Sequence, residues 1–127
     1  MNSWVLDASA VLAVLQGEIG AKVVERALPF SRISAVNASE VVTKLVDRGD
    51  PPDVASRTVL TLDCEIVPVD AGLGLRAGEL RALTRANGLS LGDRICLALA
   101  EREGLPALTA DGAWADLVVD VDIALIR

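Results

Sequence analysis

The chain has 127 residues, of which 52% are apolar and only 2% aromatic, and its net charge is −6. This length fits one domain over residues 1–127, and the negative charge excludes a protein that holds nucleic acid by bulk positive charge. Histidine is absent, which excludes a serine-type triad and any histidine metal site.

Short apolar runs alternate with segments of helical periodicity along the chain. The runs predict five strands, in chain order residues 3–6, 32–36, 65–69, 107–110 and 119–125. Apolar residues at helical spacing predict helices over residues 8–17, 19–28, 37–48, 51–64, 73–85, 93–103 and 112–117. This order predicts an α/β sandwich around a mainly parallel sheet with right-handed crossovers.

Individual residues give further predictions about two of the strands and about the cellular location of the protein. Pro68 predicts that the third strand lies at a sheet edge or ends there, and Asp120 and Asp122 predict a last strand with one wet face. Cys64 and Cys96 lack C-x-x-C spacing, which favours reduced core thiols. No apolar run reaches membrane-spanning length and no secretion signal is visible, so we expect a cytoplasmic protein without membrane contact.

Four acids occupy one kind of position in the predicted fold. Asp7 ends the first strand, Glu40 lies in the first turn of the helix after the second strand, Asp93 opens the apolar helix, and Asp111 follows the strand at 107–110. In an open parallel sheet, strand carboxyl ends and the following helix N-termini share one edge, where ligands bind. We therefore expect these acids to lie near one another.

Two explanations of these acids remain open. Each could simply cap a helix: the spacings from Asn37 to Glu40 and from Ser90 to Asp93 resemble capping boxes. Alternatively they converge, but two like charges about 4 Å apart repel by roughly 4 kcal/mol at an effective dielectric near 20. A cation would offset that repulsion, and oxygen ligands alone favour Mg²⁺ or Mn²⁺, which bind phosphates.

Four segments, in this order, carry a resemblance that spans almost the whole chain: VLDASAVLAVL, NASEVVTKL, LSLGDRICLALA and LTADGAWADL. They resemble the signature segments of PIN domains, most closely those of VapC-type toxins. The resemblance implies a three-layer α/β/α sandwich with a mainly parallel central sheet of four to five strands. It also implies a metal-dependent endoribonuclease that leaves 5′-phosphate and 3′-hydroxyl ends.

The resemblance assigns the acids residue by residue. Asp7, Glu40 and Asp93 match the acids of the first three segments, and Asp111, or alternatively Asp116, supplies the fourth. It implies that Asp7, Asp93 and Asp111 hold Mg²⁺ or Mn²⁺, directly or through water, while Glu40 joins the cluster or orients the attacking water. Two hydroxyl residues could support the carboxylates or merely start helices, and these are Ser9 and Thr109.

The resemblance also suggests partners. An RNA backbone could be contacted by Arg94, Lys44 and Arg48, although each of these could instead be an ordinary solvated residue. A VapC-like toxin would pair with a small VapB-like antitoxin that blocks the acidic cleft, and a homodimer is expected. Trp4 and Trp114 are interpreted as core residues rather than base-stacking platforms.

Three other functions compete with this one. A phosphatase of the DxD class requires an acid where this chain has Ser9. A receiver-type Mg²⁺-binding signalling module would use Asp70 as phosphoacceptor, but it needs a late lysine, and lysine occurs only at positions 22 and 44. The third is a plain interaction domain in which all the acids are helix caps.

Overall fold

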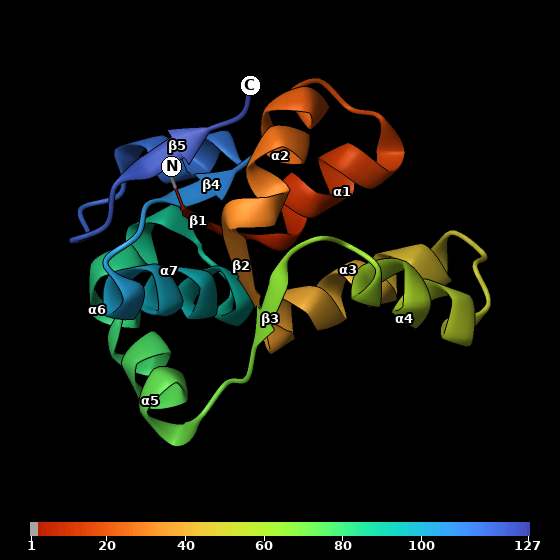
Figure 1. Ribbon diagram of the computed structural model, residues 1–127. Helices are drawn as coiled ribbons and strands as arrows, with labels where there is room; N and C mark the ends of the chain where they lie inside the picture. The colour runs from red at the N-terminus through yellow and green to blue at the C-terminus, as the bar shows by residue number, and fades with distance from the viewer. Residues whose placement is uncertain (1–2) are drawn as a thin grey trace.

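The computed structural model describes residues 3–127. Five short strands pair in parallel at the centre of the molecule (Figure 1). They are β1 (Trp4–Leu6), β2 (Ser31–Ser34), β3 (Glu65–Val67), β4 (Ala107–Thr109) and β5 (Ile123–Leu125). Their order is β3-β2-β1-β4-β5, so β1 is central and β3 is an edge strand, as Pro68 predicted. All pairings are parallel, with Leu6 opposite both Ile33 and Leu108.

Helices cover both faces of the sheet. They are α1 (Ala8–Gln16), α2 (Ala21–Ala27), α3 (Ala35–Asp47), α4 (Pro52–Leu60), α5 (Ala71–Glu79), α6 (Arg81–Thr84) and α7 (Leu91–Glu103), with 3-10 turns η1 (Leu28–Phe30), η2 (Arg85–Asn87) and η3 (Gly112–Asp116). Leu6 packs with α1 to α4 on one face, whereas Val5 packs with α5, α7 and Trp114 on the other. The predicted three-layer sandwich is therefore confirmed.

Alternation within β1 explains the two cores. Successive strand residues point to opposite faces of a sheet, so Val5 and Leu6, both fully buried, serve different layers. Helix α7 lies against β1, β2 and β4, and every residue from 95 to 100 is at most 3% exposed. Trp114 is fully buried, as expected of a core residue. Across residues 3–127, none of the helices is both long and apolar enough to cross a bilayer.

Several predicted boundaries are wrong, among them the start of the apolar helix α7, which begins at Leu91 rather than at Asp93. Helix α3 begins at Ala35, because the Ser34 hydroxyl accepts the N–H of Asn37 at 2.9 Å and caps the helix; the predicted start at Asn37, with its capping box to Glu40, is incorrect. Helix α4 ends at Leu60 rather than near Cys64. The helix predicted over residues 73–85 is broken at Leu80 into α5 and α6.

The last strand is also shorter than predicted. Only Ile123–Leu125 pair with β4, because β4 itself offers just three residues, Ala107–Thr109. Val119 and Val121 instead lie before the strand and pack against the core beside α7. Alternation of apolar and charged residues over 119–122 thus marks a half-buried loop rather than an extended strand.

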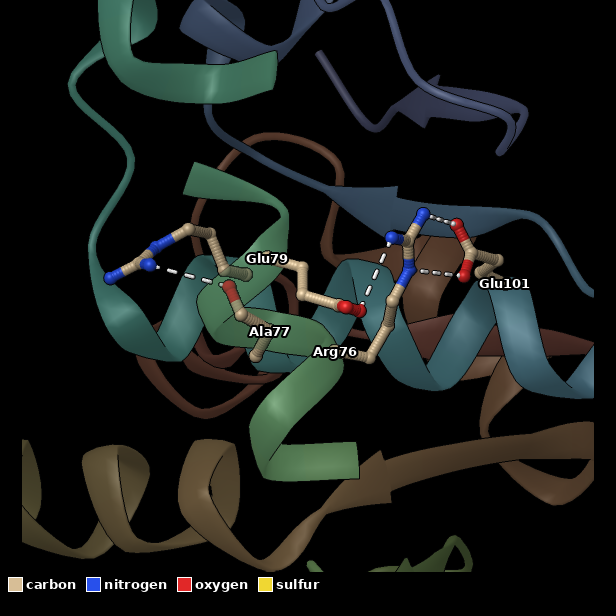
Figure 2. Close-up of polar contacts among 5 residues, drawn as sticks. Arg76, Ala77, Glu79 and Glu101 are labelled. Atoms are coloured by element: carbon tan, nitrogen blue, oxygen red, sulfur yellow. Dashed lines mark hydrogen bonds and ion pairs between the residues drawn. The ribbon is translucent and has the colours of Figure 1, made fainter. Parts of the chain in front are cut away.

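A bidentate ion pair joins α5 to α7 (Figure 2). Arg76 donates from Nε to Glu101 Oε1 at 2.7 Å and from Nη2 to Oε2 at 2.9 Å, and Glu79 lies farther off at 3.5 Å. Hydrogen bonding to Arg76 holds the pKa of Glu101 below its usual value. Both partners are partly exposed, so the pair stabilises the helix contact only modestly.

Replacing Glu101 by glutamine is expected to lower the free energy of unfolding by about 1 kcal/mol at neutral pH. A lowered pKa gives stability that is present above the ordinary glutamate pKa and is lost as the pH falls through the folded-state value. Chemical denaturation of parent and E101Q should therefore differ at neutral pH and converge in acid. Glu79→Gln is the matched control with little effect; an E101Q deficit that persists in acid would contradict this account.

Candidate acidic site at the carboxyl edge of the sheet

Asp7 lies at the carboxyl end of the central strand and is 3% exposed. It caps α1, with Oδ1 accepting the N–H of Ala10 at 2.9 Å. Ser9 Oγ lies 2.8 Å from Oδ1 and 2.9 Å from Oδ2, and Thr109 Oγ1 donates to Oδ2 at 2.5 Å. The carboxylate is therefore fixed by hydroxyls from two different segments of the chain.

The same hydroxyls tie the end of β4 to the start of α1. Ser9 Oγ accepts the N–H of Ala110 at 2.9 Å, and Thr109 Oγ1 accepts the N–H of Asp111 at 3.0 Å. The two hydroxyl oxygens are 3.2 Å apart. β1 and β4 are neighbours at the point where the strand order reverses, which is where open α/β sheets bind ligands.

Burial raises the pKa of Asp7 to about 6. The hydrogen bonds from Thr109, Ala10 and Ser9 lower it, and the negative charge of Asp93 raises it further. Among the ion pairs in residues 3–127, none involves Asp7, Glu40 or Asp93. The protein thus buries a carboxylate beside a second acid without supplying a basic side chain to offset the charge.

The first turn of α7 carries Asp93 and is approached by Glu40 from α3. Asp93 Oδ2 accepts the N–H of Ser90 at 3.0 Å, and Ser90 Oγ accepts the N–H of Asp93 at 3.2 Å, so the predicted capping box is present. The Glu40 carboxylate, from α3, packs against Gly92. The pKa of the buried Cys96 thiol is raised first by burial and then by the charges of three acids, Asp7, Asp93 and Glu40.

The fourth acid lies farther out. Asp111 is exposed and caps η3, with Oδ1 accepting the N–H of Ala113 at 2.9 Å. Asp116 is the last residue of η3 and is also exposed. Over the described residues, no three acidic or cysteine side chains converge closely enough to form a ready metal cage. Asp7 and Asp93 therefore both contribute to helix caps and lie near each other, whereas the Asp111 carboxylate accepts only the N–H of Ala113 within the described residues.

The basic residues singled out in the sequence have different surroundings. Arg94 is half-buried and donates from Nη1 to the carbonyl of Ala77 at 3.2 Å and from Nε to that of Ser90 at 3.4 Å. It therefore links α7 to α5. Lys44 and Arg48 are exposed on the α3 turns that follow Glu40.

Asn37 is the polar residue of this site that sequence reasoning missed. It is 1% exposed, and its Nδ2 donates to Glu40 Oε1 at 2.8 Å and to the carbonyl of Gly92 at 3.0 Å. The sequence does place Asn37 one helical turn before Glu40, which puts both on one face. Nothing local indicates that this face meets α7.

The model of the PIN domain family matches residues 4–119. The chain belongs to the PIN domain family. Curated relatives of this PIN domain include Ribonuclease VapC42 of Mycobacterium tuberculosis and a VapC ribonuclease of Mycobacterium bovis. Each is 35% identical over 115 residues, covering 82% of this chain and 87% of the relative.

Solved structures share the fold of this PIN domain. A toxin–antitoxin complex from Klebsiella pneumoniae matches with a TM-score of 0.75 and 21% identity, covering 98% of each chain. VapC20 of Mycobacterium tuberculosis, described as a sarcin-ricin loop cleaving toxin, matches with a TM-score of 0.71 and 22% identity, covering 90% of this chain and 95% of that one. These likenesses establish the arrangement of helices and strands.

Proposed function

We propose that this PIN domain is an Mg²⁺- or Mn²⁺-dependent endoribonuclease and the toxin of a toxin–antitoxin pair. The activity of its curated relatives, named as VapC ribonucleases, supports the reaction class. The observation that carries the proposal is the buried carboxylate of Asp7, which lies at the sheet's ligand-binding edge beside Asp93 and has no basic partner in residues 3–127. Such an acid, with its pKa shifted by burial, is typical of a functional site.

The donor chemistry of the site fits a hard divalent cation. All the candidate ligands are carboxylate oxygens, and Mg²⁺ usually keeps several waters while binding one or two carboxylates directly. Asp7 and Asp93 are proposed as those direct ligands, with Glu40 beside them. Asp111, or Asp116 in its place, would complete the site through water, which agrees with their exposed positions.

The protein residues then have separate roles in phosphodiester hydrolysis. A bound divalent ion supplies water activation and offsets the phosphate charge. Ser9 and Thr109 hold the Asp7 carboxylate in one orientation, and Glu40 accepts a hydrogen bond from the attacking water. Arg94, Lys44 and Arg48 are proposed to contact the RNA backbone. Hydrolysis leaves a 5′-phosphate and a 3′-hydroxyl.

The reaction can be tested with purified protein and end-labelled RNA. We expect cutting in Mg²⁺ or Mn²⁺, loss of cutting with EDTA, and recovery when the metal ion is restored in excess. DNA of the same sequence serves as the control substrate, and end analysis should find 5′-phosphates. Cutting that continues in EDTA, or products with 2′,3′-cyclic phosphates, would exclude the proposed chemistry.

We further propose that a small VapB-like antitoxin neutralises the protein in the cytoplasm and that the protein forms a homodimer. Solved structures with the same fold include toxin–antitoxin complexes, which supports such a partner. Co-expression with the product of an adjacent short reading frame should yield a co-purifying complex that no longer cuts RNA, and sedimentation should give the mass of a dimer for the toxin alone. A complex that cuts RNA at the full rate would contradict neutralisation.

A further inference from the structure

The Glu40 carboxylate occupies the space where any residue other than glycine would place its Cβ at position 92. A Cβ built on Gly92 would lie 2.6 Å from both Cδ and Oε1 of Glu40, which is far inside van der Waals contact. Gly92 is itself buried in the first turn of α7 and has no positive φ. Glycine is a poor helix former, so its presence here is explained by close packing rather than by backbone conformation.

Asn37 fixes the same carboxylate from the other side. Both protons of its amide group are donated, one to Glu40 Oε1 at 2.8 Å and one to the carbonyl of Gly92 at 3.0 Å. Its Oδ1 accepts from Ser34 Oγ at 2.6 Å, and Ser34 Oγ accepts the backbone N–H of Asn37 at 2.9 Å. Each polar atom of the buried amide therefore has a partner, and its orientation is determined.

These contacts join two helices at the acidic site. Gly92 directly precedes Asp93, so the amide of Asn37 binds Glu40 to the very turn that carries Asp93. Glu40 Oε1 is used in this contact, whereas Oε2 accepts no hydrogen bond from the described residues. Both oxygens of the Glu40 carboxylate therefore lie against the first turn of α7, and only Oε1 is engaged in a hydrogen bond within residues 3–127.

We propose that Asn37 and Gly92 are positioning residues that clamp the Glu40 carboxylate against the N-terminal turn of α7 and so set its placement relative to Asp93. This inference rests on the proposed metal-dependent function for its effect on catalysis. The clamp itself is a property of the metal-free protein and is testable there. Gly92 provides the space, and Asn37 provides the orientation.

Replacing Gly92 by alanine tests the positioning of the Glu40 carboxylate without weakening the helix that carries residue 92. Alanine favours the helix, which offsets the loss of the buried Asn37–Glu40 hydrogen bond, so G92A should melt close to the parent; the displaced carboxylate should nevertheless weaken Mn²⁺ binding and lower kcat by about 10-fold or more, with little change in KM. Gly78→Ala on α5 is the matched control, because a Cβ there meets nothing within 4 Å. It should leave Mn²⁺ affinity, measured by calorimetry, and kcat at the parent values.

A double-mutant comparison tests whether Gly92 acts through Glu40. In a Glu40→Ala background the carboxylate is gone, so adding G92A should change Mn²⁺ affinity and kcat no further. An equal loss in both backgrounds would overturn the proposal, and so would a G92A protein with the parent's affinity and rate.

The side-chain amide of Asn37 gives a readout independent of metal and activity. In metal-free protein its two NH₂ protons should be protected from exchange, and E40A and G92A should each shift this resonance and speed its exchange, whereas G78A should not. Asn37→Leu has a similar volume but cannot donate and adds no charge, and it should weaken Mn²⁺ binding as G92A does. If the parent neither binds Mn²⁺ nor cuts RNA, the proposed function fails while the amide signal still decides the clamp; an unprotected, unshifted amide overturns the clamp alone.

Discussion

Replacing Asp7 by asparagine is expected to abolish RNA cutting and, in metal-free protein at neutral pH, to raise the free energy of unfolding. Activity should fall by at least about 100-fold, since even residues that merely support a metal ligand contribute 10- to 100-fold. The gain in stability follows from burial, which raises the pKa of Asp7 from 3.8 to about 6. A shift of that size costs the ionised protein about 3 kcal/mol, which is an upper limit for the gain because asparagine keeps only some of the hydrogen bonds.

The pH dependence of this stability gain has a definite sign. A raised pKa gives stability that is complete below pH 3.8 and is lost as the pH rises through about 6, so the parent carries the full penalty at neutral pH. D7N carries none, and the two proteins should therefore converge in acid. Added Mg²⁺ should raise the melting temperature of the parent by mass action and leave that of D7N unchanged.

Asp70 offers a matched control for D7N. It caps α5 with nearly the same backbone angles, φ −86° and ψ 177° against −88° and 176° for Asp7, and it accepts the N–H of Leu73 at 2.8 Å. It is exposed, and its pKa is lowered by that bond and by Arg102, so D70N should lose stability at neutral pH and keep its activity. A D7N protein that melts below the parent without metal, or that cuts RNA normally, would contradict the proposed role of Asp7.

Replacing Asp93 by asparagine is the second change with a large expected effect. The side-chain amide introduced by D93N would keep an oxygen that can accept the N–H of Ser90, so the helix start should lose only a few tenths of a kcal/mol. Removing the charge also relieves its repulsion with Asp7. We therefore expect D93N to melt close to the metal-free parent while RNA cutting falls by at least about 100-fold and Mg²⁺ no longer stabilises the protein.

Replacing Ser90 by alanine distinguishes the contribution of the helix cap to stability from the role of the Asp93 carboxylate in activity. It removes the hydroxyl that accepts the N–H of Asp93 but leaves the backbone N–H at position 90 to bind the Asp93 carboxylate. S90A should lose about 1 kcal/mol of stability and retain most of its activity. The reverse pattern, with D93N active and S90A inactive, would mean that Asp93 matters as a helix cap alone.

The order of elements was predictable because it depends on local periodicity. Apolar alternation identifies the strands, and helical spacing of aliphatic residues identifies the helices that cover them. The errors fall where a neighbouring element sets the boundary. β5 begins only at Ile123, which pairs with the first residue of β4, Ala107, and α3 starts at the hydroxyl of Ser34 rather than at Asn37.

The acidic site was likewise predictable from the sequence only in part. The positions of Asp7 and Asp93 at a strand end and a helix start follow from the sequence pattern, and each caps its helix as predicted. The contacts of Asn37 with Gly92 span 55 residues, and those of Thr109 with Asp7 span 102. Neither pair carries a local signal, because hydrogen bonds between distant segments depend on how α3, α7 and β4 are placed by the sheet.

By itself, the sequence limited the metal chemistry open to these positions: without histidine and with carboxylates following its strands, they offer only oxygen ligands, which suit a hard cation. Tertiary structure alone decided which of these acids are buried and which lie exposed. It buries Asp7 and leaves Asp111 exposed, although both follow strands at the same edge. The physical reason is that desolvation depends on the elements packed around a side chain, and only the folded sheet supplies them.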